Sequence, residues 1–190
     1  MMASPARARP PSGAGYPTQA ALPATLVLDD GTRYALRRAV AADLPDIVAM
    51  FADDPLGAAR ETLSTPLPAS YGDAFAAIER DPNQELVVVT DGSDTPVGVL
   101  QLTFVPGLTH RGAWRAQIEG VRIAATARAH GLGHAFFAWA IARARARGCS
   151  LVQLTTDKSR VDAQRFYAAL GFVATHEGMK LHLDADVGRT

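Results

Sequence analysis

The stretch that decides the fold is Arg128-Ala-His-Gly131-Leu-Gly133, which lies between a strand-like and a helix-like segment. Glycines at such a junction let the backbone approach a ligand closely. A helix that starts here presents unpaired N–H groups and a positive dipole end, which suit a phosphate or pyrophosphate. A purely geometric reading stays open, because many strand-to-helix turns contain glycine. The stretch matches neither a P-loop nor the dinucleotide fingerprint.

The segments around this loop alternate between strand and helix patterns. Alternating or continuous apolar runs predict strands, and apolar residues that recur every three to four positions predict helices. The expected strands are residues 33–39, 86–90, 97–105, 114–124, 151–155, 172–175 and 179–183. The expected helices are residues 44–52, 71–80, 131–147 and 160–170. The order β-α-α-β-β-β-α-β-α-β-β predicts an α/β domain with a mixed central sheet flanked by helices.

Composition divides the chain into a tail and one domain. Residues 1–28 are rich in proline, alanine and arginine and contain no acidic residue. Such a segment buries too little apolar area to offset its ordering entropy, so we predict a disordered extension. A transit peptide is the other reading, because Arg7 and Arg9 stand without acids. Residues 29–190 are expected to form a single domain.

Charge, hydropathy and cysteine usage exclude several classes of protein. Lysine plus arginine number 19, as do aspartate plus glutamate, which argues against a dedicated nucleic-acid binder. No apolar run has the length of a membrane span, and no signal peptide is recognisable. Cys149 is the only cysteine and is read as a small core residue rather than a nucleophile. The histidines show no metal spacing, so we expect a cytoplasmic protein with no metal, nucleic-acid or membrane partner.

A second informative stretch is Phe166-Tyr167-Ala-Ala-Leu170-Gly171-Phe172. One reading is a helix end, with Phe166 and Leu170 in the core and Gly171 as the residue that ends the helix. The other reading places the Tyr167 hydroxyl in a site, where a phenol can donate a proton or a hydrogen bond.

Taken together, the two stretches resemble the GNAT superfamily of acyl-CoA-dependent N-acetyltransferases. The resemblance rests on strand, Arg-x-x-Gly-x-Gly, helix, strand, and a helix ending in Phe-Tyr-x-x-Leu-Gly-Phe, and it covers residues 33–183. It implies acetyl-CoA as co-substrate, a small-molecule amine as acceptor, and the homodimer that this superfamily often forms. A non-catalytic acetyl-CoA sensor and a protein or peptide N-acetyltransferase are the alternatives, because fold does not fix function.

The resemblance also assigns site residues. Strand positions would bond to the pantetheine arm, loop positions would hold the pyrophosphate, and two later cations are candidates for the phosphates. These positions are Val121, Arg122, Ile123, Arg128, Ala129, His130, Gly131, Leu132, Gly133, Lys158 and Arg160. For Lys158 and Arg160, a solvated charged face is the equal alternative. Gly120 is consistent with a bulge that splays neighbouring strands to admit the cofactor.

Two residues are candidates for the chemistry. Glu119 lies on the strand that would flank the thioester, and a carboxylate there can deprotonate an alkylammonium acceptor directly or through water. The alternative is an ordinary strand carboxylate that faces solvent. Tyr167 matches the helix tyrosine that protonates the leaving thiolate in this family. Asp157 stands where the family often has asparagine, and we assign it only a helix-capping role.

The acceptor side carries a thinner resemblance. Trp114 before the catalytic strand and the Asp162-Ala-x-Arg165-Phe-Tyr pattern are similar to aminoalkylphosphonate N-acetyltransferases. Arg111 and Arg115 are candidates for binding an anionic acceptor, with exposed loop arginines as the alternative.

Overall fold

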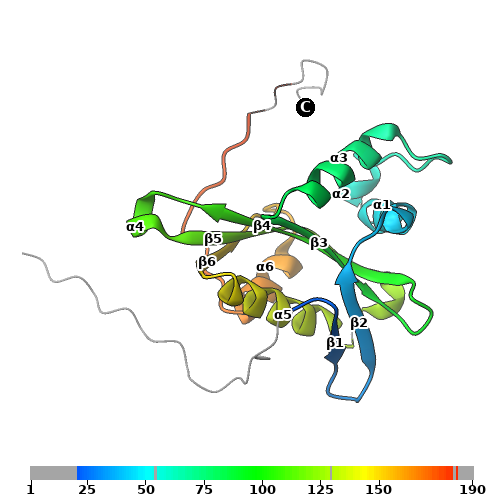
Figure 1. The fold of residues 1–190 in the computed structure, drawn as a ribbon, viewed down its shortest axis with the longest axis horizontal. Coiled ribbons are helices and arrows are strands. Elements are labelled where there is room, and N and C mark those ends of the chain that lie inside the picture. Colours follow the sequence, from blue (N-terminus) through cyan, green and yellow to red (C-terminus); the bar gives the residue numbers. More distant parts are fainter. Residues whose placement is uncertain (1–20, 54, 129, 182, 184–190) are drawn as a thin grey trace, which may run out of the picture.

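The computed structural model describes residues 21–53, 55–128, 130–181 and 183, and its centre is one sheet (Figure 1). The strands pair in chain order, antiparallel from β1 to β5, and β6 is parallel to β5. They are β1 Ala24–Val27, β2 Arg33–Arg38, β3 Gln84–Thr90, β4 Pro96–Pro106, β5 Trp114–Ile123 and β6 Cys149–Leu154. The predicted mixed α/β architecture is confirmed.

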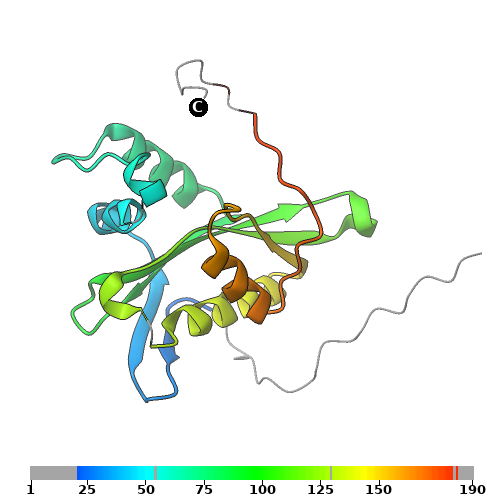
Figure 2. The same cartoon turned by 180° about the vertical axis from the view of Figure 1, so that it is seen from behind.

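Helices cover both faces of this sheet (Figures 1 and 2). The first group, α1 to α3, packs on one face, and α5 with α6 packs on the other. A short turn of helix, α4, joins β4 to β5. The bounds are α1 Leu44–Ala52, α2 Pro55–Ala58, α3 Ala69–Arg80, α4 Thr109–Gly112, α5 Leu132–Ala146 and α6 Val161–Ala169.

Alternate side chains of the central strands belong to two different core clusters, one on each face of the sheet. Successive side chains of a strand point to opposite faces. In β3, Val87 and Val89 join the cluster that contains α5, whereas Leu86 and Val88 join the cluster that contains α1 and α3. All four are buried, so β3 reads in the sequence as a continuous apolar run rather than an alternating one.

The structure corrects the predicted elements at both ends of the domain. Strand β1 lies inside residues 1–28, which were assigned to a tail, and its Leu26 is buried in the core. Four residues beside Pro23 give too short a pattern to read, and their partner is β2. The predicted strands 172–175 and 179–183 were wrong where the structure describes them, because those residues pair with no strand. Met179 and Leu181 remain exposed.

The carboxylate of Glu85 lies within the packed interior. The side chain of Glu85 on β3 has an exposed fraction of 0%. Arg143 of α5 donates to both of its carboxylate oxygens, at 3.0 and 2.6 Å, and Arg38 of β2 donates at 3.1 Å. The paired carboxylate raises the pKa of Arg143 above its ordinary value. The pairing ties α5 to the middle of the sheet.

We expect Arg143→Met to lower the free energy of unfolding by about 3 kcal/mol or more, because it leaves the buried Glu85 carboxylate with one partner fewer. Urea denaturation followed by circular dichroism measures the change. The control is Arg145→Met, an exposed arginine on the same helix. Equal losses in the two variants would contradict a special role for the Glu85 pairing.

Candidate active site

The site begins where β5 and β6 part. Their parallel pairing runs from Trp114 opposite Cys149 to Ile118 opposite Leu154, and β6 ends there. Strand β5 continues to Ile123. Its last five residues therefore pair with no described strand on the β6 side, and backbone N–H groups along this edge are open to a ligand.

Gly120 produces the change of direction in β5. The pairing with β4 steps from Gln101 opposite Glu119 to Val99 opposite Arg122, so β5 carries one extra residue. Gly120 has a φ of +59°, a left-handed conformation that glycine adopts readily. The expected bulge is confirmed. A Cβ atom on Gly120 would also lie 3.3 Å from Cζ of Phe51, which crosses it from α1.

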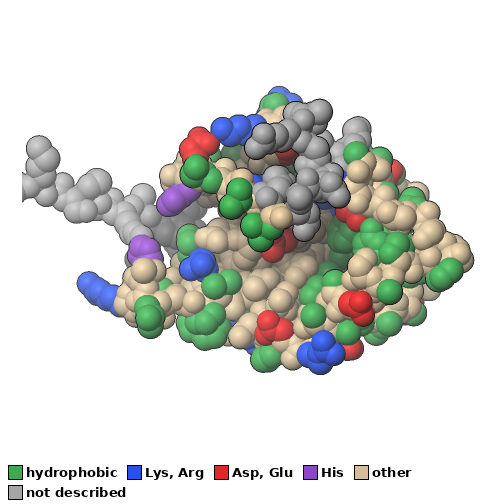
Figure 3. All heavy atoms as spheres, turned by 90° about the horizontal axis from the view of Figure 1, so that it is seen from above, with side chains coloured by type: hydrophobic (Ala, Val, Ile, Leu, Met, Phe, Trp, Pro, Cys, Tyr) green, Lys and Arg blue, Asp and Glu red, His purple; other side chains and the backbone are tan. Residues whose placement is uncertain are grey.

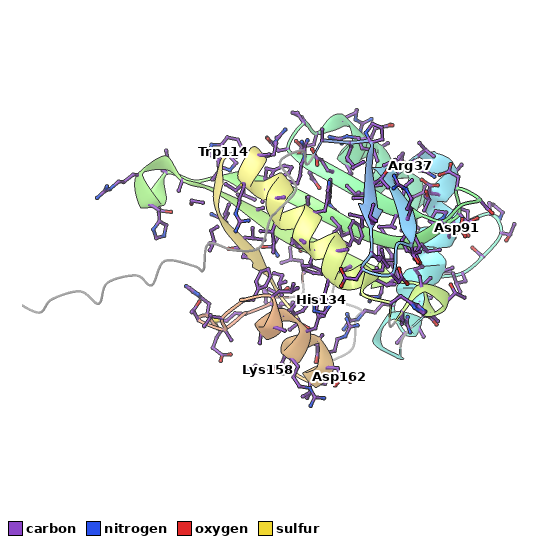
Figure 4. The ribbon with its side chains drawn as sticks, turned by 90° about the horizontal axis from the view of Figure 1, so that it is seen from below. Arg37, Asp91, Trp114, His134, Lys158 and Asp162 are labelled. Atoms are coloured by element: carbon purple, nitrogen blue, oxygen red, sulfur yellow. The ribbon has the colours of Figure 1, made fainter. Side chains whose placement is uncertain are left out.

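A pocket of about 310 Å³ lies at this opening. It is bounded by the end of β5, by the loop that follows, by the first turns of α5 and by α6. Figure 4 shows how α6, with Asp162 near its start, lies against the first turn of α5, where His134 is labelled. The lining residues are Val121, Arg122, Ile123, Arg128, Gly133, Phe137, Arg160, Phe166 and Tyr167.

Seven of the residues selected from the sequence line this pocket, although they come from three separate segments. They are Val121, Arg122, Ile123, Arg128, Gly133, Arg160 and Tyr167. Gly131 adopts a φ of +80° as the residue before α5, and Leu132, the first residue of that helix, is buried in the core. Helix α5 therefore begins directly after the glycine loop, and a helix N-terminus can bind an anion.

Five of the selected residues that the structure describes are not among those lining the pocket: Glu119, His130, Gly131, Leu132 and Lys158. His130 is exposed in the loop, and Ala129 lies outside the described residues. Lys158 is exposed, with its Nζ 3.0 Å from a carboxylate oxygen of Glu177, so it lies on the charged surface that was the alternative reading. Glu119 is exposed on β5, two residues before the first lining residue.

The pocket combines cationic and aromatic walls. Arg122, Arg128 and Arg160 supply three guanidinium groups. Arg122 donates to the carbonyl of Val121 at 2.8 Å, and Arg128 donates to the carbonyl of Ile123 at 2.9 Å. No acidic side chain is among the lining residues. The arrangement therefore favours an anionic ligand.

Sequence reasoning missed part of the aromatic wall. Phe137 and Phe166 line the pocket and pack edge to face, with ring centroids 5.4 Å apart. Phe166 had been read as a core residue. Phe137 is itself buried, so its periodicity in α5 is that of any core position. The pair could have been found only from the knowledge that α6 packs across α5.

Tyr167 lies between these rings and the arginines. Its ring is 5.5 Å from that of Phe137. Burial raises the pKa of Tyr167 above its ordinary value of 10, and nearby Arg160 and Arg122 offset part of this. The phenol therefore keeps its proton at neutral pH and can donate it. The two readings of this residue are compatible, since the ring packs and the residue also lines the pocket.

The structure does not bring the proposed acceptor arginines to this pocket. Arg111 lies in α4 and Arg115 at the start of β5, and Arg115 precedes Val121 by six residues, roughly 20 Å along a strand. In Figure 4, Trp114 marks that end of β5, well away from His134. Asp157 accepts hydrogen bonds from the backbone and hydroxyl of Ser159, and the residue at the N-cap of α6 is Arg160. Asp157 thus shapes the turn before the helix, and this lowers its pKa.

A second pocket, of about 340 Å³, lies beside the start of α1. It is lined by uncharged residues: Pro45, Leu63, Ser64, Thr65 and Leu67.

The face seen in Figure 3 is hollowed, and its charged side chains lie mainly toward the edge. Within the described ranges, no three His, Cys, Asp or Glu side chains form a group that could hold a metal ion. None of the helices described is both long and apolar enough to cross a membrane.

Comparison with known proteins adds to this geometry. Residues 49–172 match the model of the Acetyltransferase (GNAT) family. The chain is 31% identical over 107 residues to an aminoalkylphosphonate N-acetyltransferase from Salmonella typhimurium, which covers 56% of this chain and 68% of that protein. The matched family segment contains the bulge, the loop and every residue that lines the first pocket.

Two solved structures are similar over nearly their whole length. One, described as a transcriptional regulator from Bacillus halodurans C-125, is 53% identical, with a TM-score of 0.76, and covers 79% of this chain and 99% of its own. The other, an acetyltransferase from Trypanosoma brucei, is 26% identical, with a TM-score of 0.64 and the same coverage. The fold, the strand opening and these matches together show that the chain belongs to the GNAT acetyltransferase family.

Proposed function

We propose that this chain is an N-acetyltransferase that transfers acetyl from acetyl-CoA to the primary amine of a small molecule in a ternary complex. The observation that carries the proposal is the pocket at the β5–β6 opening, where an unpaired strand edge, a glycine loop and a tyrosine converge. The 31% identity to an aminoalkylphosphonate N-acetyltransferase makes an aminoalkylphosphonate the first acceptor to test.

The residues present fit acetyl-CoA. An elongated ligand with a pyrophosphate needs a cationic end, which Arg122, Arg160 and the N-terminus of α5 supply. Its pantetheine arm needs backbone partners, and the N–H groups along the edge of β5 from Val121 to Ile123 are available as donors. When bound, acetyl-CoA supplies the activated acyl group.

Two side chains of the protein then transfer protons. We assign Glu119 as the base that accepts a proton from the acceptor ammonium, because the nitrogen must lose this proton before it can attack a carbonyl carbon. We assign to Tyr167 the proton that the departing thiolate takes up. Backbone N–H groups near Val121 would stabilise the charge that develops on the carbonyl oxygen. Holding both substrates at one opening contributes further through proximity.

The experiment that tests the proposal is thiol release from acetyl-CoA across a panel of amines: aminoalkylphosphonates, amino acids, polyamines and aminoglycosides. Release that depends on one amine class is expected and would name the acceptor. Acetyl-CoA binding is measured in parallel by calorimetry. Protein that binds acetyl-CoA but releases no thiol with any small amine, nor with a mixture of lysine peptides, would overturn the enzyme proposal.

Glu119→Gln is expected to lower kcat at neutral pH by about a hundredfold or more, because the neutral amide cannot accept the acceptor's proton. Its acetyl-CoA affinity is expected to remain near that of the wild type, since Glu119 is not among the lining residues of the cofactor pocket. Steady-state kinetics with the best amine of the panel measures the effect. Glu79→Gln, an exposed position on α3, is the control. Equal turnover of wild type and Glu119→Gln would remove Glu119 from the mechanism.

Tyr167→Phe is expected to slow turnover about tenfold or more, because the phenol donates a proton to the thiolate and solvent can replace it only in part.

The pKa of Tyr167 is raised by burial, so the native state keeps this proton above pH 10 while the unfolded state loses it. Stability from this group is present below pH 10 and is lost as pH rises through the higher native pKa. Ultraviolet titration of tyrosinate should lose one of its late steps, above pH 10, in the variant. A wild-type rate would assign thiolate protonation to another group.

A second candidate function is an acetyl-CoA-binding regulatory module that transfers nothing. It is favoured by one observation, the 53% identity to a solved structure described as a transcriptional regulator. Binding of acetyl-CoA without thiol release would support this candidate, and amine-dependent release would exclude it.

A further inference from the structure

We propose that Asp53 is a positioning residue for the acetyl-CoA site, which holds Arg128 across the end of β5 and so fixes the loop that follows. This inference rests on the proposed function, because the loop acts through the cofactor that it would bind. It also changes the part assigned to Arg128. The sequence suggested a direct phosphate contact, whereas the geometry points to a bridge that holds the loop in shape.

The bridge joins segments that are far apart in the chain. Arg128 donates from Nε to the carbonyl of Ile123 at 2.9 Å and from Nη2 to Oδ2 of Asp53 at 2.7 Å. Asp53 follows the last residue of α1, Ile123 ends β5, and Arg128 follows a short 3-10 turn at Ala125–Ala127. One guanidinium therefore connects a helix end, a strand end and the pocket loop.

The location of the carboxylate is informative. Asp53 is the C-cap residue of α1, whose last turn contains no basic residue. An acid at the negative end of a helix dipole is unfavourable, so local helix energetics do not account for Asp53. The ion pair between Asp53 and the pocket residue Arg128 does account for a carboxylate at this position. The side chains of Arg128 and Asp53 are each about half exposed, at 51% and 50%, so the bond positions the loop more than it stabilises the fold.

A second contact from the same turn of α1 supports this reading. Phe51 lies against Gly120 and has the Arg122 guanidinium 5.9 Å from its ring centroid. The end of α1 thus meets both the bulge and the pocket arginine of β5. With Asp53 holding Arg128, it fixes the loop on the same side, and the N–H groups at the start of α5 are left to contact the pyrophosphate.

The chemistry of the bridge requires arginine. A planar guanidinium can bond to a carbonyl and a carboxylate at once, whereas an ammonium on a flexible stem is a point charge. Arg128→Lys therefore keeps a charge that could contact a phosphate but loses the two-sided bridge. This separates a bridging arginine from a phosphate-binding one.

The test compares Asp53→Asn and Arg128→Lys with the wild type and with Asp46→Asn. Asp46 is an exposed acid in the first turn of α1. Asp46→Asn therefore changes the net charge by the same amount as Asp53→Asn, but away from the pocket. Both test variants are expected to bind acetyl-CoA about two- to fivefold more weakly by calorimetry, the worth of a half-exposed ion pair. KM for acetyl-CoA should rise by the same factor, with a smaller change in kcat. Hydrogen exchange of amides 124–128 in the free protein should accelerate in both, and Asp46→Asn should match the wild type.

Three results would overturn the proposal. Tighter acetyl-CoA binding by Asp53→Asn would show that the carboxylate competes with the phosphates for Arg128. Wild-type affinity in Arg128→Lys would show that a point charge is sufficient. Unchanged loop exchange in Asp53→Asn would show that the bridge does not hold the loop. If the wild type itself binds no acetyl-CoA, the proposed function fails, and loop exchange in the free protein still decides whether the bridge orders the loop.

Discussion

The parting of β5 from β6 is the constraint on which the rest of the site depends. Two parallel strands that paired to their ends would use up their edge hydrogen bonds and leave no room for a ligand. Here β6 ends opposite Ile118, and the extra residue at Gly120 turns β5 away. Five residues of β5 are thereby left with an open edge. The pocket, the glycine loop and the aromatic wall are all arranged around that opening.

The elements around the opening are held by contacts that cross the sheet. Apolar packing on two faces places α5 on one side and α1 with α3 on the other. The buried Glu85, paired with Arg143 and Arg38, fixes how α5 lies on the strands. On the opposite face, Phe51 packs on the bulge itself. The geometry of the opening is thus set from both faces, because neither face alone determines where β5 turns.

Several features of the site were readable in the sequence because they are local. The glycine loop, the following helix and the Phe-Tyr-x-x-Leu-Gly-Phe ending are each short, and the longest of them, α5, has 15 residues. The predicted α1 coincides with the observed Leu44–Ala52, since its apolar periodicity is uninterrupted. The bulge at Gly120 was likewise a local inference from a glycine within a strand. Glu119 stays a candidate from sequence, exposed beside the pocket rather than lining it.

Other features depended on partners that no local pattern reveals. Strand β1 exists because β2 pairs with it, and residues 172–175, with an equally strand-like pattern, have no partner strand. Arg111 and Arg115 are close in sequence to the strand that carries Glu119, yet they lie in α4 and at the start of β5, at the far end from the pocket. Phe137 and Phe166 form a pocket wall only because α6 packs across α5.

The sequence by itself therefore determined the class of fold and the loop that starts α5, since these follow from short-range periodicity, glycine conformation and helix-terminus chemistry. Its resemblance to the GNAT superfamily supplied most of the pocket residues. Only the tertiary structure decided which side chains share the opening, that Lys158 lies on the charged surface with Glu177, and that Arg128 bonds to Asp53, 75 residues away. The physical reason is that a hydrogen bond or packed pair between distant segments depends on how strands and helices are placed in space, and that placement is set by the whole core.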